Sequence, residues 1–231
     1  MTLTYETFLP IIVWRGRYRQ AGGFPAPLWL AEPGVAGAPS GKETRMLEAL
    51  LNLDASLLLA IQDLRLDWLD PVVAFYTQLG NAGLMWIVLS LSMLCWRPTR
   101  RAGALALTAM VLGLLVTNVT IKPLVERTRP WLDLPILPLV VENDPHSFPS
   151  GHTCAAFAAR VAWAKTLPWR WGRIGAVLLA VLMVLSRLYV GVHYPTDVLA
   201  GALIGTLCAW AALKLDGYRT DRLKENKKGA K

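Results

Sequence analysis

Three short polar stretches, each at the end of an apolar run, carry the residues of this chain that are suited to chemistry. They contain the cations Lys122, Arg129 and Arg187, the histidines His152 and His193, and the carboxylate Asp197. Ammonium and guanidinium groups donate charge-assisted hydrogen bonds to phosphate oxygens, and an imidazole can attack phosphorus. The combination indicates a site that holds a phosphate group and attacks it.

The stretch Pro149-Ser150-Gly151-His152 stands directly before an apolar run that predicts a helix. Gly151 lets the backbone approach a ligand closely, and the free N–H groups of a helix N-terminus bind phosphate well. Lys122, Arg129 and Arg187 would add donors around the same group. The alternative is that these cations only end membrane spans and extend their charges to the interface.

The two histidines suit two different roles. Phosphate-ester hydrolysis without a metal can use a nucleophile and an acid for the leaving oxygen. Asp197 follows His193 by four residues, and Pro195 between them suits a helix start. The Asp197 carboxylate is therefore placed to accept the N–H of one ring nitrogen and to aim the other nitrogen at phosphorus. This pattern makes His193 the candidate nucleophile and His152 the candidate acid.

The elements that must position these residues are apolar helices. The chain is 54% hydrophobic and 17% charged, which is unusual for a soluble protein. About 20 apolar residues cross a bilayer as a helix, and the expected spans are residues 71–96, 102–121, 153–168, 174–191 and 196–213. We expect an all-α integral membrane bundle of about five transmembrane helices.

Two segments before the second span indicate helices at the membrane surface. Residues 46–62 place leucines at helical spacing with Glu48 and Asp54 among them, which predicts an amphipathic interfacial helix. The turn signal at 80–83 allows the 71–96 run to be a short surface helix followed by one span.

The chain divides into three expected regions. Residues 1–45 lack periodicity and indicate a loosely structured extension, residues 46–215 a membrane domain, and residues 216–231 a basic cytoplasmic tail. Basic loops at 97–101 and 165–173 face the cytoplasm by the positive-inside rule. The same topology collects the polar stretches on the external face of the plasma membrane. The charge of +8 then comes mainly from these loops and the tail, so no nucleic-acid partner is expected.

Other reactive residue types are expected to be structural. Cys95, Cys154 and Cys208 lack the spacing of metal ligands and suit small buried residues, so neither a metal nor a cofactor is expected. His146 is expected to be a loop residue. Arg160, in mid-span, is expected to pair inside the bundle or to extend to the interface.

The spacing of the polar residues resembles that of a known family. Lys122 precedes Arg129-Pro130 by six intervening residues, Pro149-Ser150-Gly151-His152 follows, and Ser186-Arg187 precedes His193 by five and Asp197 by nine. This ordered set resembles the type 2 phosphatidic acid phosphatase family over roughly residues 50–213. The chain departs from larger members in lacking a clear span before residue 71.

The resemblance implies a metal-independent helical phosphatase that forms a phosphohistidine on His193, with His152 as acid and Asp197 as orienting partner. It implies that the phosphoryl group is held by Lys122, Arg129, Ser150, Gly151, His152 and Arg187. Bacterial membrane members typically act on undecaprenyl diphosphate, phosphatidylglycerophosphate or phosphatidic acid, and we expect the first. The alternatives are a phosphotransferase of the same fold, a protein that binds or transports anions without turnover, and a soluble haloperoxidase, which the five spans disfavour.

Overall fold

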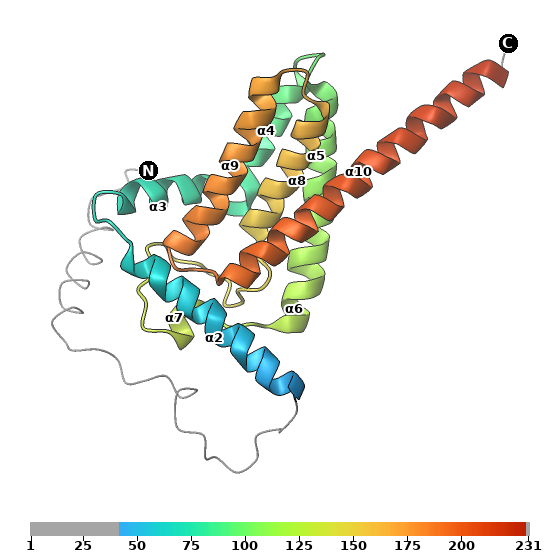
Figure 1. The fold of residues 1–231 in the computed structure, drawn as a ribbon. Helices are drawn as coiled ribbons and strands as arrows, with labels where there is room; N and C mark the ends of the chain where they lie inside the picture. Colours follow the sequence, from blue (N-terminus) through green and yellow to red (C-terminus); the bar gives the residue numbers. More distant parts are fainter. Residues whose placement is uncertain (1–41, 230–231) are drawn as a thin grey trace.

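The structure is a computed structural model that describes residues 42–229. The expected N-terminal extension therefore lies, up to residue 41, outside the described residues. The helices are α2 (Lys42–Asp63), α3 (Asp70–Leu79), α4 (Leu84–Leu94), α5 (Arg100–Leu114), α6 (Lys122–Val125), α7 (Pro130–Asp133), α8 (Gly151–Thr166), α9 (Arg170–Tyr189) and α10 (Pro195–Gly229). Within the described part no strand forms, and the expected all-α membrane bundle is confirmed (Figure 1).

Three helical stretches of the described residues are long and apolar enough to cross a membrane: Arg100–Val125, Arg170–Tyr189 and Pro195–Arg222. The first joins α5 to α6 through a π-helical segment, Leu115–Ile121. A fourth span results if α3 and α4 count as one, although they are bent by 48° at the break between them. That break falls on the expected turn, where Ala82 and Gly83 adopt positive φ.

Helix α8, the remaining expected span, is the interior helix of the bundle. At 16 residues it is about 24 Å long, shorter than the roughly 30 Å hydrocarbon core. It packs against α5, α9 and α10, and its alanines, including Ala156 and Ala159, are fully buried. The guanidinium of Arg160 lies over the ring of Phe157, 5.2 Å from the centroid.

Small residues bring α8 and α10 into backbone contact. A Cβ atom at Gly201 would lie 2.4 Å from the Ser150 carbonyl oxygen, and one at Gly205 would lie 2.2 Å from the Cys154 carbonyl oxygen. No larger residue fits at either position without separating the helices. This approach places the first turn of α8 beside the first turn of α10, and each of these turns carries one of the polar stretches.

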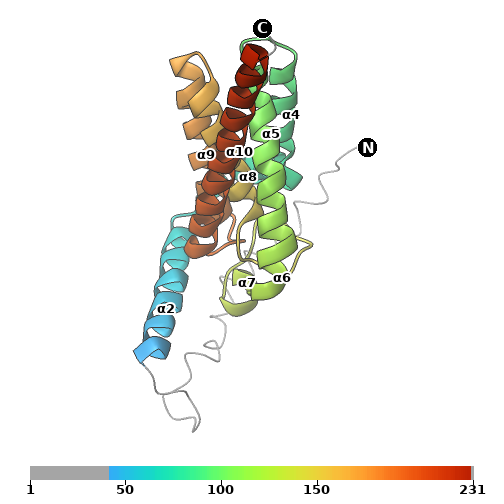
Figure 2. The same ribbon diagram turned by 90° about the vertical axis from the view of Figure 1, so that its right-hand side faces the viewer.

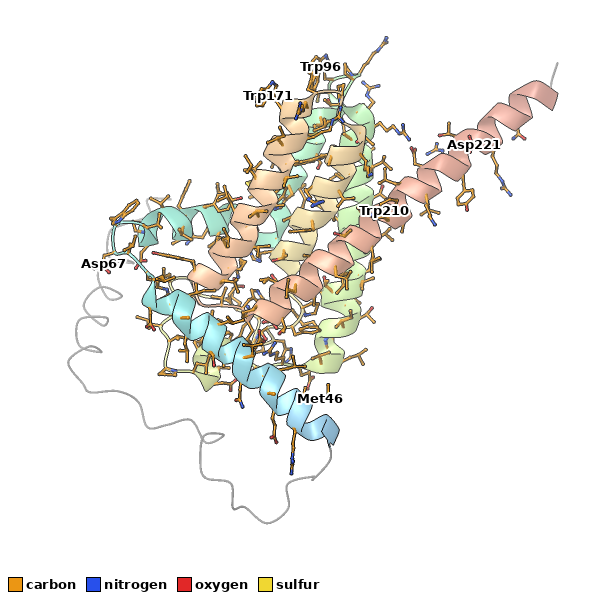
Figure 3. All side chains as sticks on the ribbon, viewed as in Figure 1. Met46, Asp67, Trp96, Trp171, Trp210 and Asp221 are labelled. Carbon is orange, nitrogen blue, oxygen red and sulfur yellow. The ribbon has the colours of Figure 1, made fainter. Side chains whose placement is uncertain are left out.

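The two ends of the bundle differ in chemistry. Figures 1 and 2 show that α6, the start of α8, the end of α9 and the start of α10 all lie at one end. Trp96 and Trp171 lie at the opposite end (Figure 3), where Trp96 stacks on Trp169 with ring centroids 5.0 Å apart. The polar stretches therefore converge at one end, and the basic loops adjoin the tryptophans at the other.

Helix α2 lies across the end of the bundle that carries the polar stretches (Figures 1 and 2). Its inward face buries Asp54, Ala55 and Leu58, and the last two pack with Leu134 and Tyr194. Leucines cover its outward face, among them Leu50 and Leu57. The helix is thus amphipathic in the opposite sense to a soluble surface helix, with its apolar side outward, as contact with lipid requires.

Candidate active site

The three candidate phosphate-binding cations come from three different elements. Lys122 begins α6, Arg129 immediately precedes α7, and Arg187 lies in the last turn of α9. All three side chains are buried; Arg187 is fully so. Buried cations need anionic or polar partners because their desolvation is costly. This cluster is therefore built to hold negative charge.

The ring of His193 lies between Arg129 and Asp197. Its Nε2 is 3.3 Å from the Arg129 Nη1, and its Nδ1 is 3.4 Å from the Asp197 Oδ2. A guanidinium can only donate, so the lone pair of Nε2 accepts from Arg129 and Nδ1 carries the proton. This is the tautomer that a nucleophilic Nε2 requires.

The surroundings of His193 favour its neutral form. Burial lowers the pKa of His193 well below its usual range, and the nearby cations Arg187, Arg129 and Lys122 lower it further. An unprotonated imidazole retains the lone pair that attacks phosphorus. The cations that would hold a phosphate thus also favour the unprotonated form of the candidate nucleophile.

The Pro-Ser-Gly-His stretch opens helix α8 as expected. The buried Ser150 caps the helix by accepting from the Thr153 N–H at 3.4 Å, and its own N–H donates to the Asp197 carbonyl oxygen at 3.0 Å. Gly151 approaches Asn118 so closely that a Cβ there would lie 3.1 Å from the amide oxygen. The His152 Nε2 lies 3.0 Å from the Asn81 Oδ1.

One cavity of about 500 Å³ connects these groups with the apolar part of the bundle. Its polar end is lined by Lys122, Arg129, Gly151, His152 and His193. Its apolar wall is formed by α4 and α5 through Ile87, Leu107, Met110, Val111 and Leu114. Such a cavity suits a ligand with an anionic head and an apolar body.

The structure brings together the residues singled out from the sequence, but neither Ser150, which caps α8, nor Ser186 lines the cavity. Arg187 and Asp197 adjoin the cavity through Glu142 and His193 respectively. Ser186 instead points its hydroxyl into its own helix and donates to the Met183 carbonyl oxygen at 2.8 Å. His146 lies in the 134–149 loop, where its N–H donates to the Asp144 carboxylate.

Two carboxylates in the cavity wall were not expected from the sequence. Glu142 pairs with Arg187 and lies 3.8 Å from the Arg129 Nη2, while the Asp144 Oδ2 accepts from the Lys122 Nζ at 2.6 Å. Burial alone would raise the pKa of Asp144, but the Lys122 ammonium and the His146 N–H together hold it below its usual value. Both carboxylates therefore pair with the cations that the sequence assigns to phosphate binding.

A third unexpected group surrounds Asp197. Arg127 donates from Nη1 to the Asp197 Oδ1 at 2.8 Å and from Nη2 to the Asp54 Oδ2 at 2.7 Å. From the sequence, Arg127 was one of the unspecified positions between Lys122 and Arg129, and Asp54 was a polar residue of an interfacial helix. The pairing of Arg127 with Asp54 joins segments far apart in the chain, so no local sequence pattern predicts it.

A helical bundle with apolar spans, buried cations around a buried imidazole and a partly apolar cavity is typical of membrane enzymes that act on phosphate groups. The sequence profile of the PAP2 superfamily matches residues 102–221. The chain belongs to this superfamily, and it is a membrane phosphatase. The family expected from the motif spacing is thereby confirmed.

Several characterised proteins are similar to the chain. An undecaprenyl-diphosphatase from Sulfolobus acidocaldarius is 29% identical over 64% of this chain and 71% of its own. Phosphatidylglycerophosphatase B from Bacillus subtilis is 33% identical over 69% of this chain and 81% of its own.

Solved structures agree with this placement. The PAP2-type phosphatidylglycerolphosphate phosphatase from Bacillus subtilis superimposes with a TM-score of 0.62 at 33% identity, covering 74% of this chain and 87% of that one. Aquifex aeolicus LpxE gives a TM-score of 0.63 at 28% identity, covering 70% of this chain and 95% of that one. The membrane phosphatase fold is therefore shared.

Proposed function

We propose that the protein hydrolyses the phosphate or diphosphate group of a membrane lipid through a phosphohistidine on His193. The observation that carries this proposal is the position of His193 at the cationic end of a cavity whose other wall is apolar. The cations hold the phosphoryl group, and the apolar wall accommodates part of the lipid chain.

The first step forms a bond between the His193 Nε2 and phosphorus and breaks the bond from phosphorus to the leaving oxygen. His152, which lines the same cavity, gives its proton to that oxygen. Asp197 stabilises the positive charge that the His193 ring gains, because its Oδ2 faces Nδ1. Water then attacks phosphorus, and the bond between phosphorus and the His193 Nε2 breaks. His152 takes up a proton of that water, and inorganic phosphate leaves.

Undecaprenyl diphosphate is the proposed substrate, with support from the named undecaprenyl-diphosphatase among the relatives. The relatives named phosphatidylglycerophosphatases support a second candidate, phosphatidylglycerophosphate.

Purified protein in detergent should be assayed against undecaprenyl diphosphate, phosphatidylglycerophosphate and phosphatidic acid, with and without an acceptor alcohol. Release of free phosphate that is undiminished by the acceptor supports hydrolysis, whereas a phosphorylated acceptor indicates a phosphotransferase. Activity should persist in chelator.

The roles of the two histidines can be separated by the leaving group. A good leaving group departs without a proton, whereas the nucleophile is needed for every substrate. We expect His152→Ala to slow hydrolysis of the lipid phosphate more than that of an activated aryl phosphate, and His193→Ala to abolish both. Equal losses for both substrates in His152→Ala would mean that His152 mainly binds phosphate.

The proposed orientation has the site on the external side of the plasma membrane and the C-terminus in the cytoplasm. Its support is that the basic loops at 97–101 and 165–173 flank spans whose opposite ends carry the site residues.

A further inference from the structure

A second buried carboxylate, Asp54 of α2, is joined to Asp197 through a single guanidinium. The Arg127 Nη2 donates to the Asp54 Oδ2 at 2.7 Å, and its Nη1 donates to the Asp197 Oδ1 at 2.8 Å. Arg127 also lies over the ring of Tyr194, 3.9 Å from the centroid. The result is a chain of charged groups that runs from α2 to the first turn of α10.

This chain of charges differs from a surface ion pair in burial and geometry. The side chain of Asp54 is 2% exposed and that of Asp197 is 0% exposed, while Arg127 retains 17%. A guanidinium is planar, so when each of two Nη atoms holds a carboxylate, the positions of both carboxylates are fixed relative to each other. Removing one member would leave a buried charge without its partner.

The arrangement determines how Asp197 faces His193. The carboxylate turns about one bond, so holding Oδ1 on Arg127 also fixes Oδ2. That second oxygen accepts the Tyr194 N–H at 2.9 Å and lies 3.4 Å from the His193 Nδ1. Without Arg127, Oδ1 loses its charged partner, and the Tyr194 N–H on Oδ2 holds the carboxylate less firmly against the imidazole that it must orient.

Asp54 fixes the backbone beneath Asp197 as well. Its Oδ1 accepts the Thr196 N–H at 2.9 Å, and its Oδ2 accepts the Thr196 hydroxyl at 2.5 Å. Asp54 therefore caps the start of α10 from a different helix, one residue before Asp197. Asp54 lies outside residues 102–221, the region matched by the family profile.

We propose that Arg127 and Asp54 are positioning residues of the reaction, which hold Asp197 in the orientation that keeps Nδ1 of His193 protonated and Nε2 aimed at phosphorus. This inference rests on the proposed nucleophilic role of His193. It makes α2 part of the catalytic apparatus, although this helix also presents leucines to its surroundings.

The competing explanation is that these contacts only fasten α2 to the bundle. A double-mutant cycle separates the two, because residues that act through one another are not additive. The variants are Arg127→Gln, Asp54→Asn and Asp197→Asn, alone and combined. The readouts are kcat and KM on the lipid substrate and the single-turnover rate of phosphohistidine formation.

Gln62→Leu is the matched control. It removes another hydrogen bond between α2 and the bundle, in which the Gln62 Nε2 donates to the Leu188 carbonyl oxygen at 2.8 Å. Gln62 has no contact with Asp197.

We expect Arg127→Gln to lower kcat about 10- to 100-fold and Asp54→Asn about tenfold, with KM changed less than about threefold. In the Asp197→Asn background each substitution should cost less than about threefold, and Gln62→Leu should keep kcat within about twofold of wild type. Full additivity with Asp197→Asn, or an equal loss in Gln62→Leu, would overturn the proposal in favour of simple fastening.

Two further measurements keep the outcomes distinct. If Arg127→Gln does not fold, Arg127→Lys retains the cation but cannot hold both carboxylates, and the same loss of kcat is expected at a Tm close to that of wild type. Unchanged kcat in Arg127→Lys would contradict the proposal. If His193→Ala retains turnover, the proposed function itself fails; if it abolishes turnover while Arg127→Gln and Asp54→Asn behave as wild type, only the positioning role fails.

Discussion

Glu142 and Asp144 place two carboxylates on the same cations that would grip a phosphoryl group. Arg187 pairs with Glu142, and Lys122 pairs with Asp144. Such pairing satisfies the buried cations, since isolated buried charges are costly. We therefore expect an incoming phosphate to compete with these carboxylates for the cations, so that binding of the substrate exchanges one anion for another.

Neutralising Asp144 should therefore strengthen the binding of phosphate mimics. For Asp144→Asn we expect the inhibition constant of orthovanadate to fall about three- to tenfold, because Lys122 loses a charged competitor. Inhibition is measured with the aryl phosphate substrate. Asn143→Ala, at the exposed residue between the two carboxylates, serves as the control and should leave the constant unchanged. Weaker inhibition in Asp144→Asn would show that Asp144 orients Lys122 for the ligand.

The depressed pKa of His193 predicts a pH-dependent cost to stability. Between the folded pKa and the usual value near 6.5, the unfolded chain binds a proton that the folded protein excludes. This cost is absent above about pH 6.5. As the pH falls below that value, the free energy of unfolding declines by up to about 1.4 kcal/mol per pH unit. The Tm of wild type in detergent should thus fall relative to that of His193→Asn from pH 7 to pH 5. Parallel Tm curves would refute this.

At the scale of elements, the contact between α8 and α10 sets the distance between the candidate acid and the candidate nucleophile. We expect Gly205→Ala to lower both Tm and turnover, since its Cβ would meet the Cys154 carbonyl oxygen at 2.2 Å, and overpacking costs about 1–3 kcal/mol. A Cβ atom at Gly175 of α9 would have no neighbour within 4 Å. Gly175→Ala should therefore be neutral or slightly stabilising. Equal Tm values for the two variants would contradict this view of the contact.

The helices also differ in how much of their position could be predicted from the sequence alone. The start of α8 and the start of α10 followed from local signals, the Pro-Ser-Gly-His stretch before an apolar run and the proline at 195, and the helices begin at Gly151 and Pro195. Apolar content predicted the spans but could not distinguish an interior helix such as α8 from a lipid-facing one, because both are rich in apolar residues. The burial of Asp54 against Arg127 depends on how α2 docks, which no local pattern encodes.

At the scale of the whole molecule, the proposed topology can be tested at the C-terminus. A reporter enzyme that is active only outside the cytoplasm, fused after Lys231, should be silent, because basic loops and a basic tail favour the cytoplasmic side of the membrane. The same reporter inserted in the exposed loop at Asn143 should be active. The reverse pattern would mean that the site faces the cytoplasm.

Helix α10 also relates the site to the thickness of the bilayer. Asp216, which follows Asp197 by 19 residues in the same helix, pairs with Arg101 at 2.8 Å near the opposite end of the bundle. The two carboxylates are about 28 Å apart along the helix axis, close to the roughly 30 Å of a hydrocarbon core. In the proposed topology, the buried charge cluster and the ion pair would bracket the acyl region. A lipid phosphate would then meet His193 at its own headgroup depth, without withdrawing its chain from the membrane.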